Sequence, residues 1–126
     1  MSRLYPLEVQ PRTLSPLTLA FVGDGVYELM VRERLACLAN RPAGDLHRLT
    51  VDMVRAEAQS AALDRILPLL TEEEEAVFRR GRNAHTARNS HDYHRATGVE
   101  ALFGYLYLNG EQQRLRELFD EIVKDL

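Results

Sequence analysis

The stretch that decides the fold of this chain is LAFVGDGVYELMV, residues 19–31. Its apolar residues recur at helical spacing, yet it carries an acid, Asp24, between two glycines, Gly23 and Gly25. An ionised carboxylate among apolar side chains is costly unless it is paired or holds a metal ion. Glycine costs a helix about 1 kcal/mol relative to alanine, so two of them indicate that another backbone or a bulky ligand approaches here. A tight contact between helices, with Asp24 paired to an arginine, explains the pattern equally well.

A second stretch, RATGVEALFGYLYL at residues 95–108, repeats this pattern around the acid Glu100. Its small residues are Gly98, Ala101 and Gly104. Two helices with small faces can pack closely, and that packing would bring Asp24 and Glu100 together. Two carboxylates that share a site repel each other, and a divalent cation relieves the repulsion. Sites of one or two carboxylates that retain water suit Mg²⁺, so the two stretches predict a magnesium site.

The charge of the chain is distributed unevenly. Its net value of −3 at pH 7 argues against a nucleic-acid binder when taken alone. However, residues 79–95, the cationic segment, hold five arginines and three histidines against one acid. This segment either attracts phosphates or is a solvated face that balances the four glutamates at residues 72–75. Those glutamates follow Thr71 and are predicted to stabilise a helix N-terminus.

Length and composition fit one soluble globular domain, since the chain has 126 residues, of which 45% are hydrophobic. No apolar run is long enough to cross a bilayer, and the N-terminus lacks the apolar core of a signal peptide. The single cysteine, Cys37, excludes an intramolecular disulfide, and we expect it to be a small buried hydrophobe. The expected compartment is the cytoplasm.

The periodicity predicts an all-α chain, because no sustained alternation or hairpin turn is present. The predicted helices span residues 16–38, 50–67, 72–80, 90–108 and 111–124. Ser15 and Thr50 are the expected N-caps of the first two, and Ser90 or Asn89 is that of the helix bearing Glu100. Thr71 forms a capping box with Glu74, and Gly81 is the expected C-cap of the third.

Several polar and aromatic residues have structural interpretations. Glu28 and Arg32 are spaced for an ion pair along one helix, which we favour over a metal role for Glu28. We expect Tyr27, Tyr105 and Tyr107 to be core or interface aromatics. The four histidines lack the spacing of a zinc site.

These motifs resemble a known family. VGDGVYEL at residues 22–29 resembles the ribonuclease III signature around its catalytic aspartate, and TGVEALFGYL at residues 97–106 resembles its second acidic helix. GDLHRL at residues 44–49, TEEEEAV at residues 71–77 and RGRNA at residues 80–84 are similar to the short Mini-ribonuclease III subfamily. The resemblance covers nearly the whole chain.

Two positions depart from the larger ribonuclease III enzymes. Those enzymes carry a glutamate where this chain has Ala20 and an aspartate where it has Thr97. Mini-ribonuclease III is similar in lacking both acids. The resemblance therefore implies that Asp24 and Glu100 are the catalytic and metal-binding residues, with water and substrate phosphate completing the shell of Mg²⁺.

The resemblance also implies fold, activity and partners. We expect an all-α ribonuclease III endonuclease domain over residues 1–126, dimeric and without a double-stranded-RNA-binding domain. It implies Mg²⁺-dependent cleavage of double-stranded RNA, with staggered cuts that leave 5′-phosphate and 3′-hydroxyl ends. The implied substrate is precursor ribosomal RNA, particularly the ends of the large-subunit (23S) precursor, and a ribosomal protein is the expected partner that presents it.

Within the cationic segment, the resemblance favours phosphate binding over a solvated face. The expected RNA-binding residues are Arg82, Asn83, His85 and Arg88. The alternative function is a noncatalytic RNA-binding or ribosome-assembly module with the same fold, which the missing acids at two positions would fit. A helical protein-interaction domain is a third alternative. The presence of both Asp24 and Glu100 favours the enzyme, because a purely structural domain requires neither.

Overall fold

The computed structural model describes residues 3–84 and 90–126, so the expectations for His85 and Arg88 lie outside the described residues. The helices are η1 (Pro11–Thr13), α1 (Pro16–Leu38), α2 (Ala43–Val54), α3 (Ala56–Ile66), η2 (Leu67–Leu69), α4 (Glu72–Arg82), α5 (His91–Leu108) and α6 (Gln112–Val123). The described residues contain no strand, which confirms the all-α fold class. No helix among them has the length and apolar character needed to cross a membrane.

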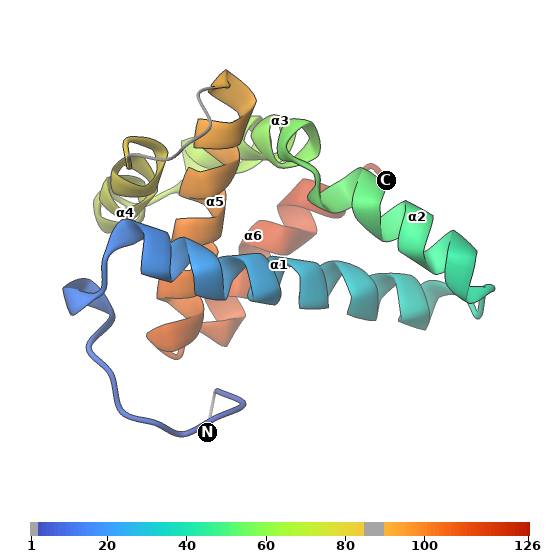
Figure 1. Cartoon of the computed structure of the whole chain (residues 1–126), viewed down its shortest axis with the longest axis horizontal. Helices are drawn as coiled ribbons and strands as arrows, with labels where there is room; N and C mark the ends of the chain where they lie inside the picture. Colours follow the sequence, from blue (N-terminus) through green and yellow to red (C-terminus); the bar gives the residue numbers. More distant parts are fainter. Residues whose placement is uncertain (1–2, 85–89) are drawn as a thin grey trace.

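Helix α5 is the centre of the molecule. It contacts α1, α3, α4 and α6, which surround it (Figure 1). Every residue from 96 to 106 is buried except Glu100, which keeps partial exposure. A helix that is buried on all sides needs neighbours on all sides, so the other helices are arranged around this one.

Helices α1 and α5 cross with their backbones in direct contact. A Cβ atom added to Gly23 would lie 1.6 Å from the backbone oxygen of Glu100, and one added to Gly104 would lie 1.9 Å from that of Leu19. The prediction that small residues let these helices approach closely is therefore confirmed. Gly25 differs, because a Cβ there would meet nothing within 4 Å.

Small residues make a second close contact, between α4 and α5. A Cβ on Gly81 would lie 2.7 Å from the Cβ of Ala101, and one on Gly98 would lie 2.6 Å from the ring of Phe78. The prediction that Gly81 is a C-cap is wrong, because α4 continues to Arg82 and Asn83 caps it. The small residues of α5 therefore contact two helices: Gly104 faces α1, whereas Gly98 faces α4.

The helix starts agree with the sequence at three places. The hydroxyls of Ser15 and Ser90 accept hydrogen bonds from backbone N–H groups in α1 and α5. Thr71 and Glu74 form the predicted capping box, and Arg114 of α6 donates to both carboxylate oxygens of Glu74 at 2.8 Å. The glutamate run is thus confirmed as a structural feature of the N-terminus of α4.

Three other expectations are wrong. Thr50 is not an N-cap: it lies inside α2 and its hydroxyl donates to the backbone oxygen of Leu46. The single helix predicted over residues 50–67 is also wrong, because the extended ψ of 158° at Arg55 separates α2 from α3. Cys37 is exposed rather than buried, because the last turn of α1 extends beyond the helices that cover its first half.

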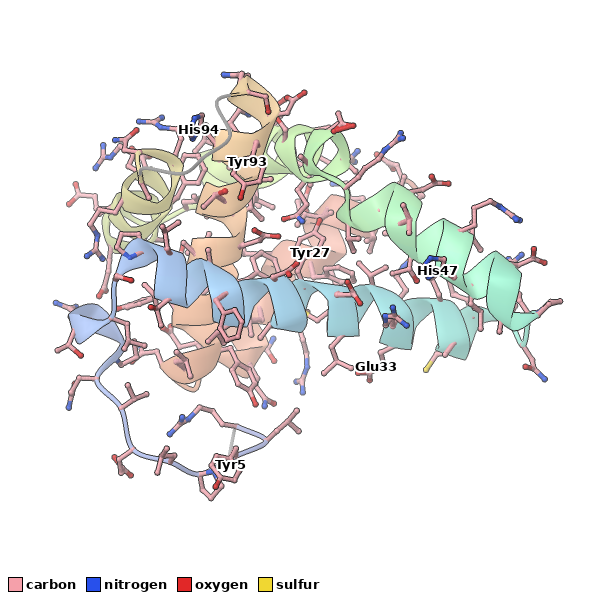
Figure 2. All side chains as sticks on the ribbon, viewed as in Figure 1. Tyr5, Tyr27, Glu33, His47, Tyr93 and His94 are labelled. Carbon is pink, nitrogen blue, oxygen red and sulfur yellow. The ribbon has the colours of Figure 1, made fainter. Side chains whose placement is uncertain are left out.

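Tyr27 and Tyr105 lie in the core as predicted, and Tyr107 is partly buried against it. Tyr27 is buried and its ring packs against the rings of Phe103 and Phe119, with centroids 5.0 and 6.0 Å away (Figure 2). Tyr105 is buried too, and its hydroxyl donates to Glu73 at 2.6 Å. These contacts join α1, α4, α5 and α6 around one centre.

The crossing of α1 and α5 gives the first prediction. Gly23→Ala should lower the free energy of unfolding by about 3 kcal/mol or more, because its methyl group would overlap the α5 backbone, which a side-chain rotation cannot relieve. Gly25→Ala is the matched control two residues away. It should raise the free energy of unfolding by about 1 kcal/mol, because it adds helix propensity in open space. Urea unfolding of the three proteins measures both values, and equal stability of the two variants would contradict the crossing.

Candidate active site

The crossing of α1 and α5 places two acids side by side. Asp24 follows the contact glycine of α1, and Glu100 is the α5 residue whose backbone oxygen lies against that glycine. Their side chains are within hydrogen-bonding reach of each other. Asp24 is exposed and Glu100 is partly buried, so this carboxylate pair (Asp24 and Glu100) is open to solvent on one side.

Glu100 is in an unfavourable environment for a charge. Burial and the neighbouring Asp24 raise its pKa to about 7, although a hydrogen bond from Gln59 opposes the shift. Burial and the charge of Glu100 also raise the pKa of Tyr27. Among the described residues, no ion pair involves either acid. The alternative in which an arginine pairs with Asp24 therefore finds no support in this part of the chain.

Gln59 of α3 is a site residue that the sequence did not reveal. Its side chain is 1% exposed, and its Nε2 donates to the backbone oxygen of Val54 at 2.8 Å and to Oε2 of Glu100 at 3.1 Å. Its other amide atom, Oε1, is buried without a hydrogen-bond partner. No motif marks a glutamine in an alanine-rich helix, and only the packing of α3 on α5 brings it here.

The carboxylate pair fits a divalent cation. A buried carboxylate beside a second one lacks a counterion, and the neighbouring Oε1 of Gln59 is an oxygen without a donor. Over residues 3–84 and 90–126, no three or more acidic, histidine or cysteine side chains gather as a metal site. Ala20 and Thr97 are buried, at 6% and 4% exposure. The protein thus offers two carboxylates, which leaves other positions in the shell of a cation to water and phosphate.

The described residues of the cationic segment divide into two groups. Arg95 donates to Ser60 and Asp64 of α3, and Arg79 pairs with Glu75 at 3.4 Å, so both have structural partners. Arg82 ends α4, with its guanidinium over the ring of Phe78 and its Nε donating to the side chain of Asn83. The solvated-face interpretation therefore holds for Arg79, which balances one of the glutamates, whereas Arg95 is a structural residue and Arg82 and Asn83 stay candidates for RNA binding.

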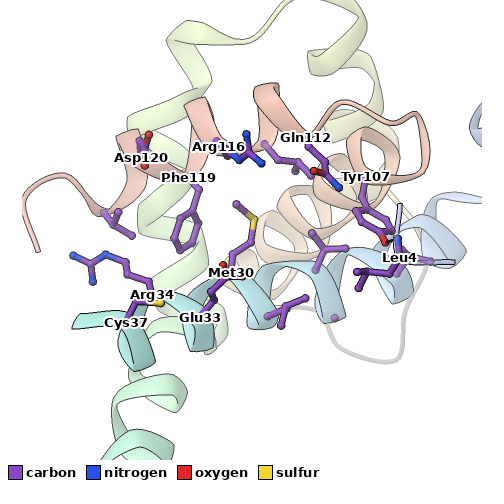
Figure 3. Close-up of a pocket in the computed structure, with 16 residues that line it drawn as sticks. Leu4, Met30, Glu33, Arg34, Cys37, Tyr107, Gln112, Arg116, Phe119 and Asp120 are labelled. Atoms are coloured by element: carbon purple, nitrogen blue, oxygen red, sulfur yellow. Dashed lines mark hydrogen bonds between the residues drawn. The ribbon is translucent and has the colours of Figure 1, made fainter. Parts of the chain in front are cut away.

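A separate groove of about 700 Å³ lies between α1 and α6 (Figure 3). Its walls are largely apolar and include Val26 and Met30 of α1 and Phe119 of α6. Neither member of the carboxylate pair lines it. The groove is therefore a surface distinct from the candidate active site, although Gly25 links the two along α1.

Comparison with known proteins gives these residues a context. The Ribonuclease III domain matches residues 17–111, a span that includes both acids. The chain belongs to the ribonuclease III family. Membership implies that the chain is an endoribonuclease and that it uses a divalent metal cofactor.

The relatives of the chain are short proteins. Mini-ribonuclease 3 of Symbiobacterium thermophilum is 51% identical over 113 residues, which cover 86% of this chain and 87% of that protein. Mini-ribonuclease 3 of a Thermoanaerobacter species is 46% identical, over 89% of this chain and 82% of that protein. A crystal structure of a protein from Fusobacterium nucleatum is 28% identical and superposes with a TM-score of 0.81, covering 90% of this chain and 94% of that one.

Proposed function

We propose that the chain is a Mg²⁺-dependent endoribonuclease that cleaves double-stranded RNA and matures the ends of large-subunit precursor ribosomal RNA in the cytoplasm. The observation that carries the proposal is the carboxylate pair: two acids meet at the crossing of α1 and α5 without an arginine or lysine beside them in the described part of the chain. The precursor substrate is inferred from the resemblance to Mini-ribonuclease III, the name that the similar proteins carry.

Asp24 and Glu100 hold the cation in this proposal. When bound, Mg²⁺ supplies an activated water and offsets the charge that builds on the scissile phosphate. Attack of water on phosphorus displaces the 3′ oxygen, so the products carry 5′-phosphate and 3′-hydroxyl ends. The exposure of Asp24 lets the phosphate reach the pair, while the partial burial of Glu100 lowers the local dielectric and strengthens its attraction for a cation.

Arg82 and Asn83 are proposed to bind the RNA backbone, together with His85 and Arg88 outside the described residues. A duplex RNA is recognised mainly through its shape, its phosphates and its 2′-hydroxyls, for which an arginine at a helix end is suited. Because the net charge of the chain is −3, we infer that its own affinity for RNA is weak. A ribosomal protein that presents the precursor is the partner that fits this role.

We also propose that the protein acts as a two-fold dimer, so that one active site cuts each strand. Large apolar side chains are exposed on α1: Phe21 is 79% exposed, Leu29 is 49% exposed and Leu17 is 42% exposed. A cluster of this kind on one helix is typical of a contact surface between proteins. The groove between α1 and α6 extends this apolar surface.

The carboxylate pair gives a prediction in which activity and stability move in opposite directions. Asp24→Asn and Glu100→Gln should each lower the cleavage rate on duplex RNA with Mg²⁺ by at least ~10³-fold. At pH 8, Glu100→Gln should also raise the free energy of unfolding of the metal-free protein by about 2 kcal/mol, because it removes a buried charge beside Asp24. Cleavage assays and urea unfolding in a chelator measure the two effects.

The pH dependence of that stabilisation is its control. An acid whose pKa rises on folding destabilises the folded state progressively as pH increases from its unfolded pKa of 4.5 to its folded pKa of about 7, and by a constant amount above that. The gain from Glu100→Gln should therefore be full at pH 8 and nearly absent at pH 4. Near-normal cleavage by either variant would contradict the assignment of that residue. Tight Mg²⁺-independent RNA binding without any cleavage by the wild type would instead favour the noncatalytic module.

Arg82 gives a prediction about RNA affinity. Arg82→Ala should weaken binding to all duplexes alike and lower the slope of log affinity against log salt by about 1, because one phosphate contact is lost. It should raise KM more than it lowers kcat. Arg48→Ala is the matched control, since Arg48 lies on α2 at the opposite end of the molecule from α4 (Figure 1) and should leave the slope unchanged. Superimposable salt titrations of wild type and Arg82→Ala would show that Arg82 belongs to a solvated face.

The exposed face of α1 gives a prediction about assembly. The wild type should sediment at about twice 14.4 kDa, and Phe21→Glu should shift it to the monomer, because a charge replaces the most exposed apolar side chain of α1. Leu69→Glu is the control, since Leu69 is an apolar residue of η2 that is 47% exposed and lies outside α1. A wild type that sediments as a monomer and still cuts both strands in one encounter would contradict the dimer.

A further inference from the structure

We propose that Gln59 is a positioning residue of the active site: its amide N–H holds Glu100 in place, and its Oε1 accepts a hydrogen bond from the water around the divalent cation. This inference rests on the proposed function, because it requires a cation at Asp24 and Glu100. It adds a neutral residue of α3 to a site for which the sequence indicated only two acids.

The orientation of the Gln59 amide is fixed by its neighbours. Both N–H donors are used, one by the backbone oxygen of Val54 at 2.8 Å and one by Oε2 of Glu100 at 3.1 Å. A backbone carbonyl can only accept, so the amide nitrogen and not the oxygen must face Val54. The oxygen atom, Oε1, therefore lies on the side of the amide group that does not face Val54.

That oxygen has no partner within the described protein. Gln59 is only 1% exposed, and its Oε1 is buried without a hydrogen bond. An unsatisfied buried acceptor destabilises the folded state, so such groups are normally paired with protein, water or an ion. Mg²⁺ keeps several of its waters in protein sites, and those waters are donors. A hydrated cation beside Glu100 would supply the donor that Oε1 lacks.

The charge of the site explains why an amide is suited to this position. A third carboxylate would add repulsion to two acids that already stand side by side, whereas an N–H donor stabilises the ionised form that binds a cation. Ala20 and Thr97 stand where the larger enzymes carry acids; neither carries a carboxylate, and the Thr97 hydroxyl donates to the backbone oxygen of Tyr93. Gln59 thus supplies a neutral oxygen, Oε1, to a site that has only two acids.

The fold holds Gln59 rigidly. Its backbone N–H donates to the oxygen of Arg55 at the bend between α2 and α3. The next residue, Ser60, accepts a hydrogen bond from Arg95 of α5 through its hydroxyl, and its backbone oxygen accepts a second one. These contacts tie α3 to α5 one turn from Glu100 and restrain the backbone that carries the amide. Residues in such positions typically change metal affinity by about 10–100-fold when they are replaced.

The test compares metal binding by three proteins. Gln59→Met keeps the length of the side chain but can neither donate to Glu100 nor accept at Oε1. Calorimetric titration with Mn²⁺ alone should show affinity lowered by about 10–100-fold relative to wild type. Gln113→Met is the matched control: it makes the same substitution at an exposed residue of α6 and should leave Mn²⁺ affinity unchanged. Circular dichroism checks that each variant is folded.

The outcomes separate this inference from the proposed function. If wild type binds no Mn²⁺, or binds it as tightly after Asp24→Asn, the metal site itself is wrong. If wild type binds Mn²⁺ through the pair and folded Gln59→Met binds equally well, only the role of Gln59 is overturned. Cleavage provides a second readout: high Mg²⁺ should restore the rate of Gln59→Met but not that of Asp24→Asn.

A measurement on wild type covers the case in which Gln59→Met does not fold. The side-chain amide of Gln59 should change its ¹⁵N and ¹H chemical shifts as Mg²⁺ is added, because Oε1 gains a donor. The side-chain amide of Asn109, at the end of α5, should not shift, since its hydrogen bond to Glu111 is far along the helix from the pair. Saturation of the site with Mg²⁺ without a shift at Gln59 would overturn the proposal.

Discussion

The contact between the backbones of α1 and α5 is the constraint on which the rest of the structure depends. Gly23 and Gly104 let the two helices approach until only backbone atoms separate them. Because that approach fixes the rotation of both helices, Tyr27 is directed into the core against Phe103, and Asp24 lies beside Glu100. Core and candidate site are therefore consequences of one crossing. A side chain at either glycine would disturb both together.

The same crossing creates an electrostatic conflict that the fold alone does not resolve. Glu100 is the only partly exposed residue in an otherwise buried run of α5, and its neighbour Asp24 carries the same charge. A domain selected for stability alone would replace one of these acids with an apolar or amide side chain. Their presence is better explained by chemistry that needs two anionic oxygens, as expected in an endoribonuclease that uses a divalent metal. The hydrogen bond from Gln59 reduces the conflict but leaves it in place.

The acids of the site could be predicted from the sequence, but their surroundings could not. Asp24 and Glu100 stand out because each interrupts an apolar helical pattern beside small residues, and that signal is local. Gln59 gives no such signal, since its role depends on the packing of α3 against α5. The RNA contacts proposed for Arg82 and Asn83 stay predictions, whereas Arg95, an equally basic residue of the same segment, is bound to Ser60 and Asp64.

The sequence by itself determined that the chain is helical and where several helices begin, because a cap such as Ser15 or Thr71 bonds to N–H groups only three residues away. It also determined the family, since the motifs around both acids are contiguous. Only the tertiary structure decided that Gly81 packs against α5 rather than ending α4, and that Cys37 is exposed. The physical reason is the range of the interaction. Hydrogen bonds within a turn are encoded by neighbouring residues, whereas burial depends on which distant helix covers a given face.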